Sequence, residues 1–371
     1  MISKGRATAR EAAARLLLVT GSVAACALVA ETGLRVAGYE PARFQAPGEL
    51  WGPRERVFLD CYPSNPRGYF DIDLRRPEVR ARYESAGVTG IDGVAARTPW
   101  AVEFRYDRLF FRERELGPKP VGVTRVVLLG DSFTEGQGVK EEDTTARRLE
   151  ALLNASGPRR FEVLNCARRG ADFPSLHKMF EKVLPYGPDI VVHAMVLNDP
   201  ERSREFEARR TGLDDWILER RRLVTAPEPF PPAASRLVEF VRDRLEARRI
   251  GGETTRWYLD LYGPANAEGW ARTQAAMRDM DARMRERGGR FLVASWPLLV
   301  DLQSYPFSAA DEAVARFCAA AAIPRVDLRP ALAVRPAPSL WVHPVDHHPN
   351  EVAHRLAAEA LLGPIRALAP R

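Results

Sequence analysis

The chain has 371 residues, which is long enough to bury a substantial core without a disulfide scaffold. Its 46% hydrophobic and 28% charged residues are ordinary for a globular protein and exclude a long disordered or low-complexity chain. The formal net charge is +6, but acidic residues stand among the basic ones. The sequence has no basic stripe with interleaved aromatics and no nucleic-acid motif, so we expect no nucleic-acid partner.

The cysteines predict neither a metal site nor a disulfide framework. Cys26, Cys61, Cys166 and Cys318 form no CxxC pair and no cluster with histidines, so we expect no structural zinc. Because Cys26 falls in the apolar N-terminal segment, the rest of the chain has enough cysteines for one intramolecular disulfide at most. The cysteines therefore do not identify the redox compartment.

Residues 1–38 have the pattern of a signal sequence. Basic residues come first, and an apolar stretch follows from Leu16 to Ala30. That stretch is shorter than the roughly 20 residues of a membrane span, but its extension to Gly38 reaches this length. Basic residues before the segment favour a cytoplasmic N-terminus and place the rest of the chain outside.

Three interpretations of this segment stay open. We favour an uncleaved signal anchor over a cleaved signal peptide. The third is a lipoprotein signal, because Val23-Ala24-Ala25-Cys26 resembles a bacterial lipobox, although the residues after Cys26 stay apolar where a polar tether is expected. All three export the folded part. We therefore predict a membrane-anchored protein with its catalytic domain outside the cytoplasm (periplasmic), and a secreted or lipoprotein form is the alternative.

Residues 39–120 are rich in proline, arginine and aromatic residues. This composition predicts irregular structure with short strands, such as one over Trp100–Tyr106. We expect residues 39–120 to form an N-terminal extension that packs on the main domain. No motif in it indicates a chemistry.

From residue 123 onward, short apolar runs alternate with helical segments. The runs lack polar alternation, which is typical of strands buried on both faces. Strands are expected at 125–129, 161–164, 190–196, 291–295 and 325–328, and helices at 142–155, 174–185, 265–287, 308–322 and 350–362. This alternation predicts an α/β fold with a doubly wound parallel sheet, whose ligands bind beyond the carboxyl ends of the strands. The predicted domain covers 121–371, with a helical insertion at about 200–262.

A serine follows the first predicted strand, in Gly130-Asp131-Ser132-Phe133-Thr134-Glu135-Gly136. Gly130 permits a tight turn there. If Ser132 begins a helix, its own N–H and the helix dipole favour a developing negative charge. The alternative is a serine that only caps a helix.

The next two strands run into Asn165–Gly170 and Leu197–Pro200. Because parallel strands end at the same edge, both loops should lie near Ser132. The N–H of Gly170 and the side-chain amide of Asn198 are then candidate oxyanion donors. Their alternatives are an ordinary loop glycine and a turn or cap residue.

A histidine-rich segment, Trp341–Asn350, precedes the last predicted helix. A serine hydroxyl needs a general base and a group that orients the base. Asp346 and His348 are close enough in sequence to form such a pair. His343 and His347 compete for the role of base, and metal binding or a plain surface position are the alternatives.

These residues together resemble the SGNH/GDSL hydrolase superfamily, in particular its membrane-anchored bacterial members. The blocks occur in the expected order as Gly130-Asp131-Ser132, Asn165 to Gly170, Leu197-Asn198-Asp199 and Asp346-His347-His348-Pro349-Asn350. The resemblance covers about 123–365 and implies the SGNH hydrolase fold, a flavodoxin-like five-stranded parallel sheet. Two positions depart from the pattern: Val196 stands where the family often has glycine, and Asp346 lies two residues before the histidine, not three.

The resemblance also implies residue roles and an activity. Ser132 would be the nucleophile, with its N–H in an oxyanion hole completed by the Gly170 N–H and the Asn198 side chain. His348 would take and return the proton, and Asp346 would orient it. We therefore expect a serine esterase that removes an acyl group, such as O-acetyl, from a glycan or small ester, with no cofactor and no metal. The alternatives are an O-acyltransferase acting on a cell-envelope polysaccharide and a non-catalytic binding protein on the same fold.

Overall fold

A computed structural model of the chain describes residues 2–39, 70–72, 101–103, 105–155, 157–209, 231–343 and 346–370. Within these ranges it leaves out the side-chain surroundings of residues 2–9, 70–72, 101–103, 343 and 346. The chain divides into two compact units. One comprises residues 1–50 and 210–254, and the other comprises residues 51–209 and 255–371. The larger unit contains all the predicted site residues.

The larger unit is built on a five-stranded sheet in the order β4-β3-β5-β6-β7, and every pair in it is parallel. The strands are β3 (Val123–Gly130), β4 (Arg160–Asn165), β5 (Ile190–Met195), β6 (Arg290–Ser295) and β7 (Arg325–Asp327). This confirms the predicted doubly wound sheet and its five strands. The strand order reverses between β3 and β5, and ligands of such sheets bind at this point, beyond the strand ends.

Both faces of the sheet are buried, as the continuous apolar runs predict. Alternate side chains of β3 enter different cores: Val127 and Leu129 belong to one, and Val126 and Leu128 to the other. All four side chains are at most 1% exposed. A strand that faces two cores needs apolar residues at every position, which is why these strands show no polar alternation.

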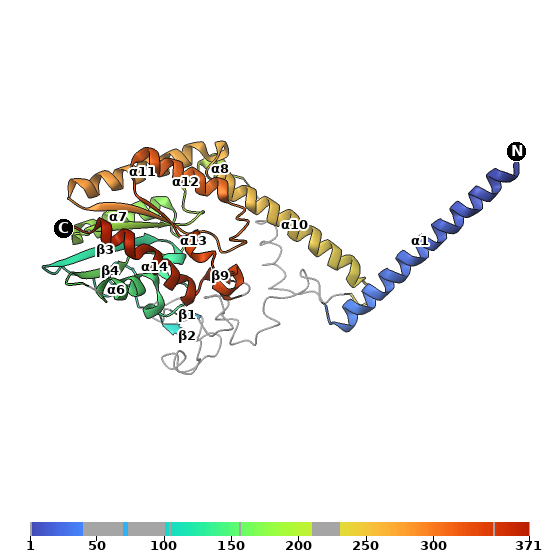
Figure 1. Cartoon of the computed structure of the whole chain (residues 1–371), viewed down its shortest axis with the longest axis horizontal. Coiled ribbons are helices and arrows are strands. Elements are labelled where there is room, and N and C mark those ends of the chain that lie inside the picture. Colours follow the sequence, from blue (N-terminus) through green and yellow to red (C-terminus); the bar gives the residue numbers. More distant parts are fainter. Residues whose placement is uncertain are drawn as a thin grey trace. The chain divides into compact units, whose positions relative to one another are not determined.

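Helices cover the two faces (Figure 1). One face is covered by α6 (Thr145–Asn154) and α14 (Glu351–Leu368), and the other by α7 (Phe173–Val183), α11 (Ala267–Glu286) and α12 (Ser308–Ala321). The side chains of Thr144, Asp172 and Asn350 cap the first turns of α6, α7 and α14. The remaining short helices are α5 (Ser132–Glu135), η2 (Glu141–Asp143), η3 (Leu184–Tyr186), α8 (Arg204–Glu207), η4 (Pro264–Asn266), α13 (Arg329–Leu332) and η5 (Ala337–Leu340).

Two small sheets complete this unit. β1 (Phe70–Ile72) pairs in parallel with β2 (Ala101–Glu103), which falls within the strand expected at Trp100–Tyr106. β8 (Trp341–His343) pairs in antiparallel fashion with β9 (Asp346–Pro349). The second pair forms a hairpin directly before α14.

Residues 105–120 pack on the sheet through buried charged side chains. The Glu113 carboxylate accepts the N–H of Asn165 at 2.6 Å and forms an ion pair with Arg147. Arg112 is 1% exposed, and its guanidinium donates to three backbone carbonyls beyond β3. This part of the predicted extension therefore supports the loop that follows the first strand. The predicted boundaries at 38 and 120 remain predictions.

The smaller unit contains α1 (Ile2–Val36) and the first turns of α10 (Arg236–Asp260). The Glu31 carboxylate of α1 accepts the N–H groups of Arg236 and Leu237 at 3.1 and 2.8 Å, so it caps α10 from outside that helix. From Arg10 to Val36, α1 is long and apolar enough to cross a membrane, by length and composition alone. The helix is longer than the apolar stretch seen in the sequence because it includes the basic segment 2–15 before that stretch and continues through Glu31 and Arg35 after it.

Candidate active site

Ser132 lies directly beyond the end of β3, at the point where the strand order reverses. It is the first residue of α5, and the Asp131 carboxylate caps this short helix by accepting the N–H of Phe133 at 2.9 Å. Gly130 is needed for a reason other than the predicted tight turn. Its φ is not positive, but a Cβ there would lie 2.4 Å from the Thr134 hydroxyl oxygen and 3.0 Å from the Ala194 carbonyl oxygen.

His348 of β9 meets Ser132 across the sheet edge. Its Nε2 lies 2.8 Å from the Ser132 Oγ, and both side chains are half-buried. The Phe133 ring packs edge-on against the imidazole, with ring centroids 5.3 Å apart. His347 instead stacks on Trp341, with ring centroids 3.8 Å apart. Of these two neighbouring histidines, it is His348 that contacts the serine.

Asn350 holds the hairpin that carries His348. It is fully buried, and its side-chain oxygen caps α14 by accepting the N–H of Val352. Its amide nitrogen donates to the carbonyls of Ser339 and Trp341 at 2.9 and 3.0 Å. One side chain therefore fixes both β8 and the start of α14, the two elements between which His348 lies.

The two other predicted oxyanion donors, Gly170 and Asn198, lie in the loops that follow β4 and β5. The backbone of β4 stays beside β3 beyond the sheet, because the N–H of Arg168 donates to the Gly130 carbonyl at 3.0 Å. Gly170 lies two residues later, is exposed, and has a φ of +69°, a conformation that favours glycine. The N–H groups of Ser132 and Gly170 donate no hydrogen bond to any other residue in the described ranges. Within this part of the chain, both are therefore candidates to bind an oxyanion.

Asn198 interacts with Asp131, the residue before the serine. Its side-chain amide donates a hydrogen bond to the buried Asp131 carboxylate, and this bond lowers the pKa of Asp131. An asparagine amide has two N–H groups, so one is still available after this bond is made. Burial, together with the nearby Asp199, outweighs the bond and raises the pKa of Asp131 to about 7.

A buried pair supports the turn that carries Asn198. His193 of β5 and Asp199 are 3.0 Å apart, and neither side chain is exposed. The Asp199 carboxylate also accepts the N–H of Val196 at 3.0 Å, which closes the turn from Val196 to Asp199. Burial lowers the pKa of His193 to about 3 and raises the pKa of Asp199.

The raised pKa of Asp131 predicts a stability that depends on pH. An acid whose pKa is higher in the folded state stabilises the fold below its unfolded pKa, and this contribution is lost as the pH rises through the folded value. For Asp131 the loss falls between about pH 4 and pH 7, at up to about 1.4 kcal/mol per pH unit. Asp131→Asn keeps an acceptor for Phe133 but has no charge. We expect its melting temperature to fall less than that of the wild type between pH 5 and pH 8. An equal fall in both proteins would contradict the assignment.

Several features of the site were not predicted from the sequence. Arg112 holds the loop after Ser132, and Gln137 contacts His348, with its Nε2 3.4 Å from the imidazole Nδ1. The only sequence signal for Gln137 is its position between two glycines, Gly136 and Gly138. Conversely, the predicted acid Asp346 lies on β9, but its side chain lies outside the described residues, as does that of His343.

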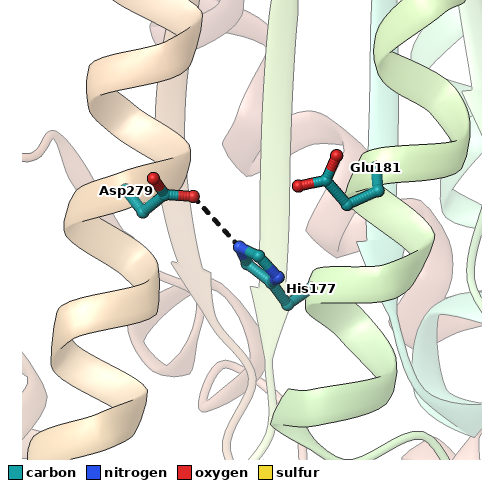
Figure 2. A group of neighbouring side chains, drawn as sticks. All are labelled: His177, Glu181 and Asp279. Atoms are coloured by element: carbon teal, nitrogen blue, oxygen red, sulfur yellow. Dashed lines mark hydrogen bonds and ion pairs between the residues drawn. The ribbon is translucent and has the colours of Figure 1, made fainter.

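A second group of titratable side chains lies on the helical surface (Figure 2). His177 and Glu181 of α7 point toward Asp279 of α11, and the His177 Nε2 lies 3.0 Å from the Asp279 carboxylate. Arg283 forms a two-pronged ion pair with Glu181, and one of its nitrogens lies 3.6 Å from Asp279. The Arg283 guanidinium therefore offsets part of the carboxylate charge, and we assign the group as an ion-pair cluster between the two helices.

Comparison with known proteins gives a family for the chain. No curated protein sequence matches it. The lipase/acylhydrolase from Enterococcus faecalis is similar in structure, with a TM-score of 0.41 and 14% identity over 67% of this chain and 97% of that one. A catalytic variant of Axe2, an acetylxylan esterase from Geobacillus stearothermophilus, has a TM-score of 0.40 and 16% identity over 65% and 94% of the two chains.

The family model described as the GDSL-like Lipase/Acylhydrolase family matches residues 128–356. These residues contain the end of β3 with Ser132, strands β4 to β7, and the hairpin with His348. The match spans more than half of the chain. The protein thus belongs to the GDSL-like lipase/acylhydrolase family and is an ester-hydrolysing enzyme.

Proposed function

We propose that the protein is a serine esterase that cleaves its substrate through a covalent acyl-enzyme. The observation that carries this proposal is the distance of 2.8 Å between the Ser132 Oγ and the His348 Nε2. A serine hydroxyl becomes a good nucleophile when a neighbouring base takes its proton. We assign this role to His348, and the support is its contact with the serine hydroxyl.

The remaining roles follow from the positions around this pair. As the Ser132 Oγ bonds to the ester carbonyl carbon, its proton passes to the His348 Nε2 and then to the leaving alcohol. The N–H groups of Ser132 and Gly170 and the amide of Asn198 bind the negative oxygen of the tetrahedral intermediate. Asp346, two residues before His348, is proposed as the acid that orients the imidazole. Water then resolves the acyl-enzyme by the same steps in reverse.

We further propose that the substrate is an acyl ester outside the cytoplasm, such as an O-acetylated glycan or a small ester. The support is α1, which has the length and composition of a membrane span from Arg10 to Val36. Its Glu31 carboxylate accepts N–H groups from the first turn of α10, so loss of α1 by cleavage would uncap α10. This contact favours an uncleaved signal anchor.

The test is covalent labelling of the full chain in bacterial membranes. We expect a fluorophosphonate probe to label the wild type, and Ser132→Ala to lose both the labelling and the hydrolysis of p-nitrophenyl acetate. The anchor is read from the same samples, because the labelled band should stay in membranes washed with alkaline carbonate. A wild type that neither labels nor turns over would contradict the esterase proposal, and a labelled band released by the wash would contradict only the anchor.

A further inference from the structure

The end of α1 is fixed to the beginning of α10 inside the smaller unit. Glu31 accepts two N–H groups from the first turn of α10. The Tyr39 hydroxyl donates to the Asp243 carboxylate at 2.6 Å, and the Tyr39 ring packs edge-on against Phe240 with ring centroids 5.4 Å apart. The first two turns of α10 therefore lie beside the end of α1.

The apolar part of α1 is short for a membrane span. Residues 16–30 extend over about 22 Å as a helix, whereas the hydrocarbon core of a bilayer is about 30 Å thick. If α1 spans the membrane, as proposed, the turn that contains Glu31 lies at the edge of this core. The Glu31 carboxylate is satisfied there by α10 itself, through two N–H groups and the Ser235 hydroxyl. The first turn of α10 is then at the level of the lipid headgroups.

α10 exposes an apolar stripe on the face opposite the residues that contact Tyr39. The stripe consists of Val238, Val241 and Leu245, which are 62%, 47% and 60% exposed. Their spacing of three and four residues places them on one face of the helix. Residues 240 and 243, which contact Tyr39, lie on the other face. A helix on a protein surface normally has polar residues on its outer face, so this stripe needs a partner.

Exposed large hydrophobic side chains are concentrated on α1 and α10. Outside these two helices, the described part of the chain exposes only Phe110, Val121 and Val334. Single exposed residues of this kind are normal, whereas a continuous stripe marks an interaction surface. The stripe begins next to Leu237, whose N–H is bonded to Glu31 of the proposed membrane span.

The exposed charges around the stripe are positive. Between residues 238 and 249, the exposed charged side chains are all arginines: Arg242, Arg244, Arg248 and Arg249. The acidic residues of this segment are buried or half-buried. Arg242, Glu246 and Arg249 line one open groove together with the stripe. Arg242 and Arg249 are each paired with a glutamate of the same helix, but exposed pairs of this kind contribute little and can be exchanged for a phosphate.

We propose that the first turns of α10 lie on the outer surface of the membrane. Val238, Val241 and Leu245 insert between the lipids, and Arg242 and Arg249 bind the anionic phosphates of their headgroups. A helix of this kind is held by its apolar face and by the attraction of its basic side chains to anionic lipid. This inference rests on the proposed membrane anchor and is independent of the esterase activity.

The test is photo-crosslinking of the full chain in vesicles made of equal parts of phosphatidylglycerol and phosphatidylcholine, with both lipids radiolabelled. The photoreactive residue p-benzoylphenylalanine is introduced at one exposed position at a time. In place of Leu245 it should attach lipid. In place of Ala247, an exposed residue outside the stripe, it should attach at least about fivefold less. Val29 of α1, which is 73% exposed, is the control position for the anchor and should attach lipid in the same vesicles.

The arginines are tested with the same probe at position 245. Arg242→Gln combined with Arg249→Gln should lower the attachment of lipid about two- to fivefold in the mixed vesicles, and less in phosphatidylcholine alone. Arg256→Gln changes an exposed arginine further along α10 and is the matched control, which should leave the attachment unchanged. An equal attachment with and without Arg242 and Arg249 would overturn their proposed contact with lipid.

The possible failures can be distinguished. Lipid attached at position 29, but no more at 245 than at 247, would overturn the proposal and leave the anchor intact. A cross-link from position 245 to a second copy of the chain, in place of lipid, would assign the stripe to a dimer and would also overturn it. No lipid at position 29 would contradict the anchor and the proposal together. None of these results depends on ester turnover, so a failure of the esterase proposal is a separate outcome.

Discussion

Ser132→Ala and His348→Ala are each expected to lower kcat by about 10⁴- to 10⁶-fold, and the double variant should lose no more than either single variant. The reason is that the two side chains act as one unit. The Oγ and Nε2 lie 2.8 Å apart, and in the proposed mechanism the hydroxyl attacks only while the imidazole takes its proton. Once one of the pair is missing, the other has no reaction to assist.

The measurement is the turnover of an activated ester by the wild type, the two single variants and the double variant. His347→Ala is the matched control, because His347 is adjacent in sequence but stacks on Trp341 instead of reaching the serine. It should retain most of the activity. Losses that multiply in the double variant would mean that the two residues act independently, and this outcome would contradict the proposed acyl-enzyme mechanism.

The sheet could be predicted from the sequence because its strands face two cores. Such strands are uninterrupted apolar runs, and the predicted boundaries lie within two residues of the observed ones. The crossover helices were recognisable for the related reason that each buries only one side. The ends of the strands then indicated where Ser132, Gly170 and Asn198 lie, since parallel strands end at one edge.

The residues that support the site could not be predicted in the same way. Arg112 is one of 55 basic residues, and nothing in its neighbourhood distinguishes a buried guanidinium from a surface one. Its role depends on backbone carbonyls at positions 135, 136 and 139, which are set by the shape of a loop. The contact between Gln137 and His348 joins positions 211 apart and requires the fold itself.

The polar residues around the serine are connected by hydrogen bonds that extend into the core. Asp131 caps α5, which begins with Ser132, and the same carboxylate accepts a bond from Asn198. Asn198 sits on the turn closed by Asp199, which is paired with His193 inside the core. The proposed nucleophile and the proposed oxyanion donor are therefore positioned by shared buried groups, and a substitution of one should change the position of the other.

Asn198→Ala is expected to lower turnover strongly, because it removes a proposed oxyanion donor. Loss of an oxyanion donor is expected to lower kcat by about 10²- to 10³-fold, with little change in KM, because the donor binds the developing charge more strongly than the ground-state carbonyl. Ester turnover measured over a range of substrate concentrations separates the two constants.

The same substitution also removes the hydrogen-bond partner of Asp131, so a purely structural effect must be separated from the catalytic one. In an Asp131→Asn background the residue beside the serine carries no charge and depends less on the Asn198 amide. If Asn198 donates to the oxyanion, its removal should cost a similar factor in kcat in this background as in the wild type. If instead Asn198 serves only to satisfy the buried carboxylate, the loss should largely disappear when the carboxylate is neutral, and the hole would then consist of the Ser132 and Gly170 N–H groups alone.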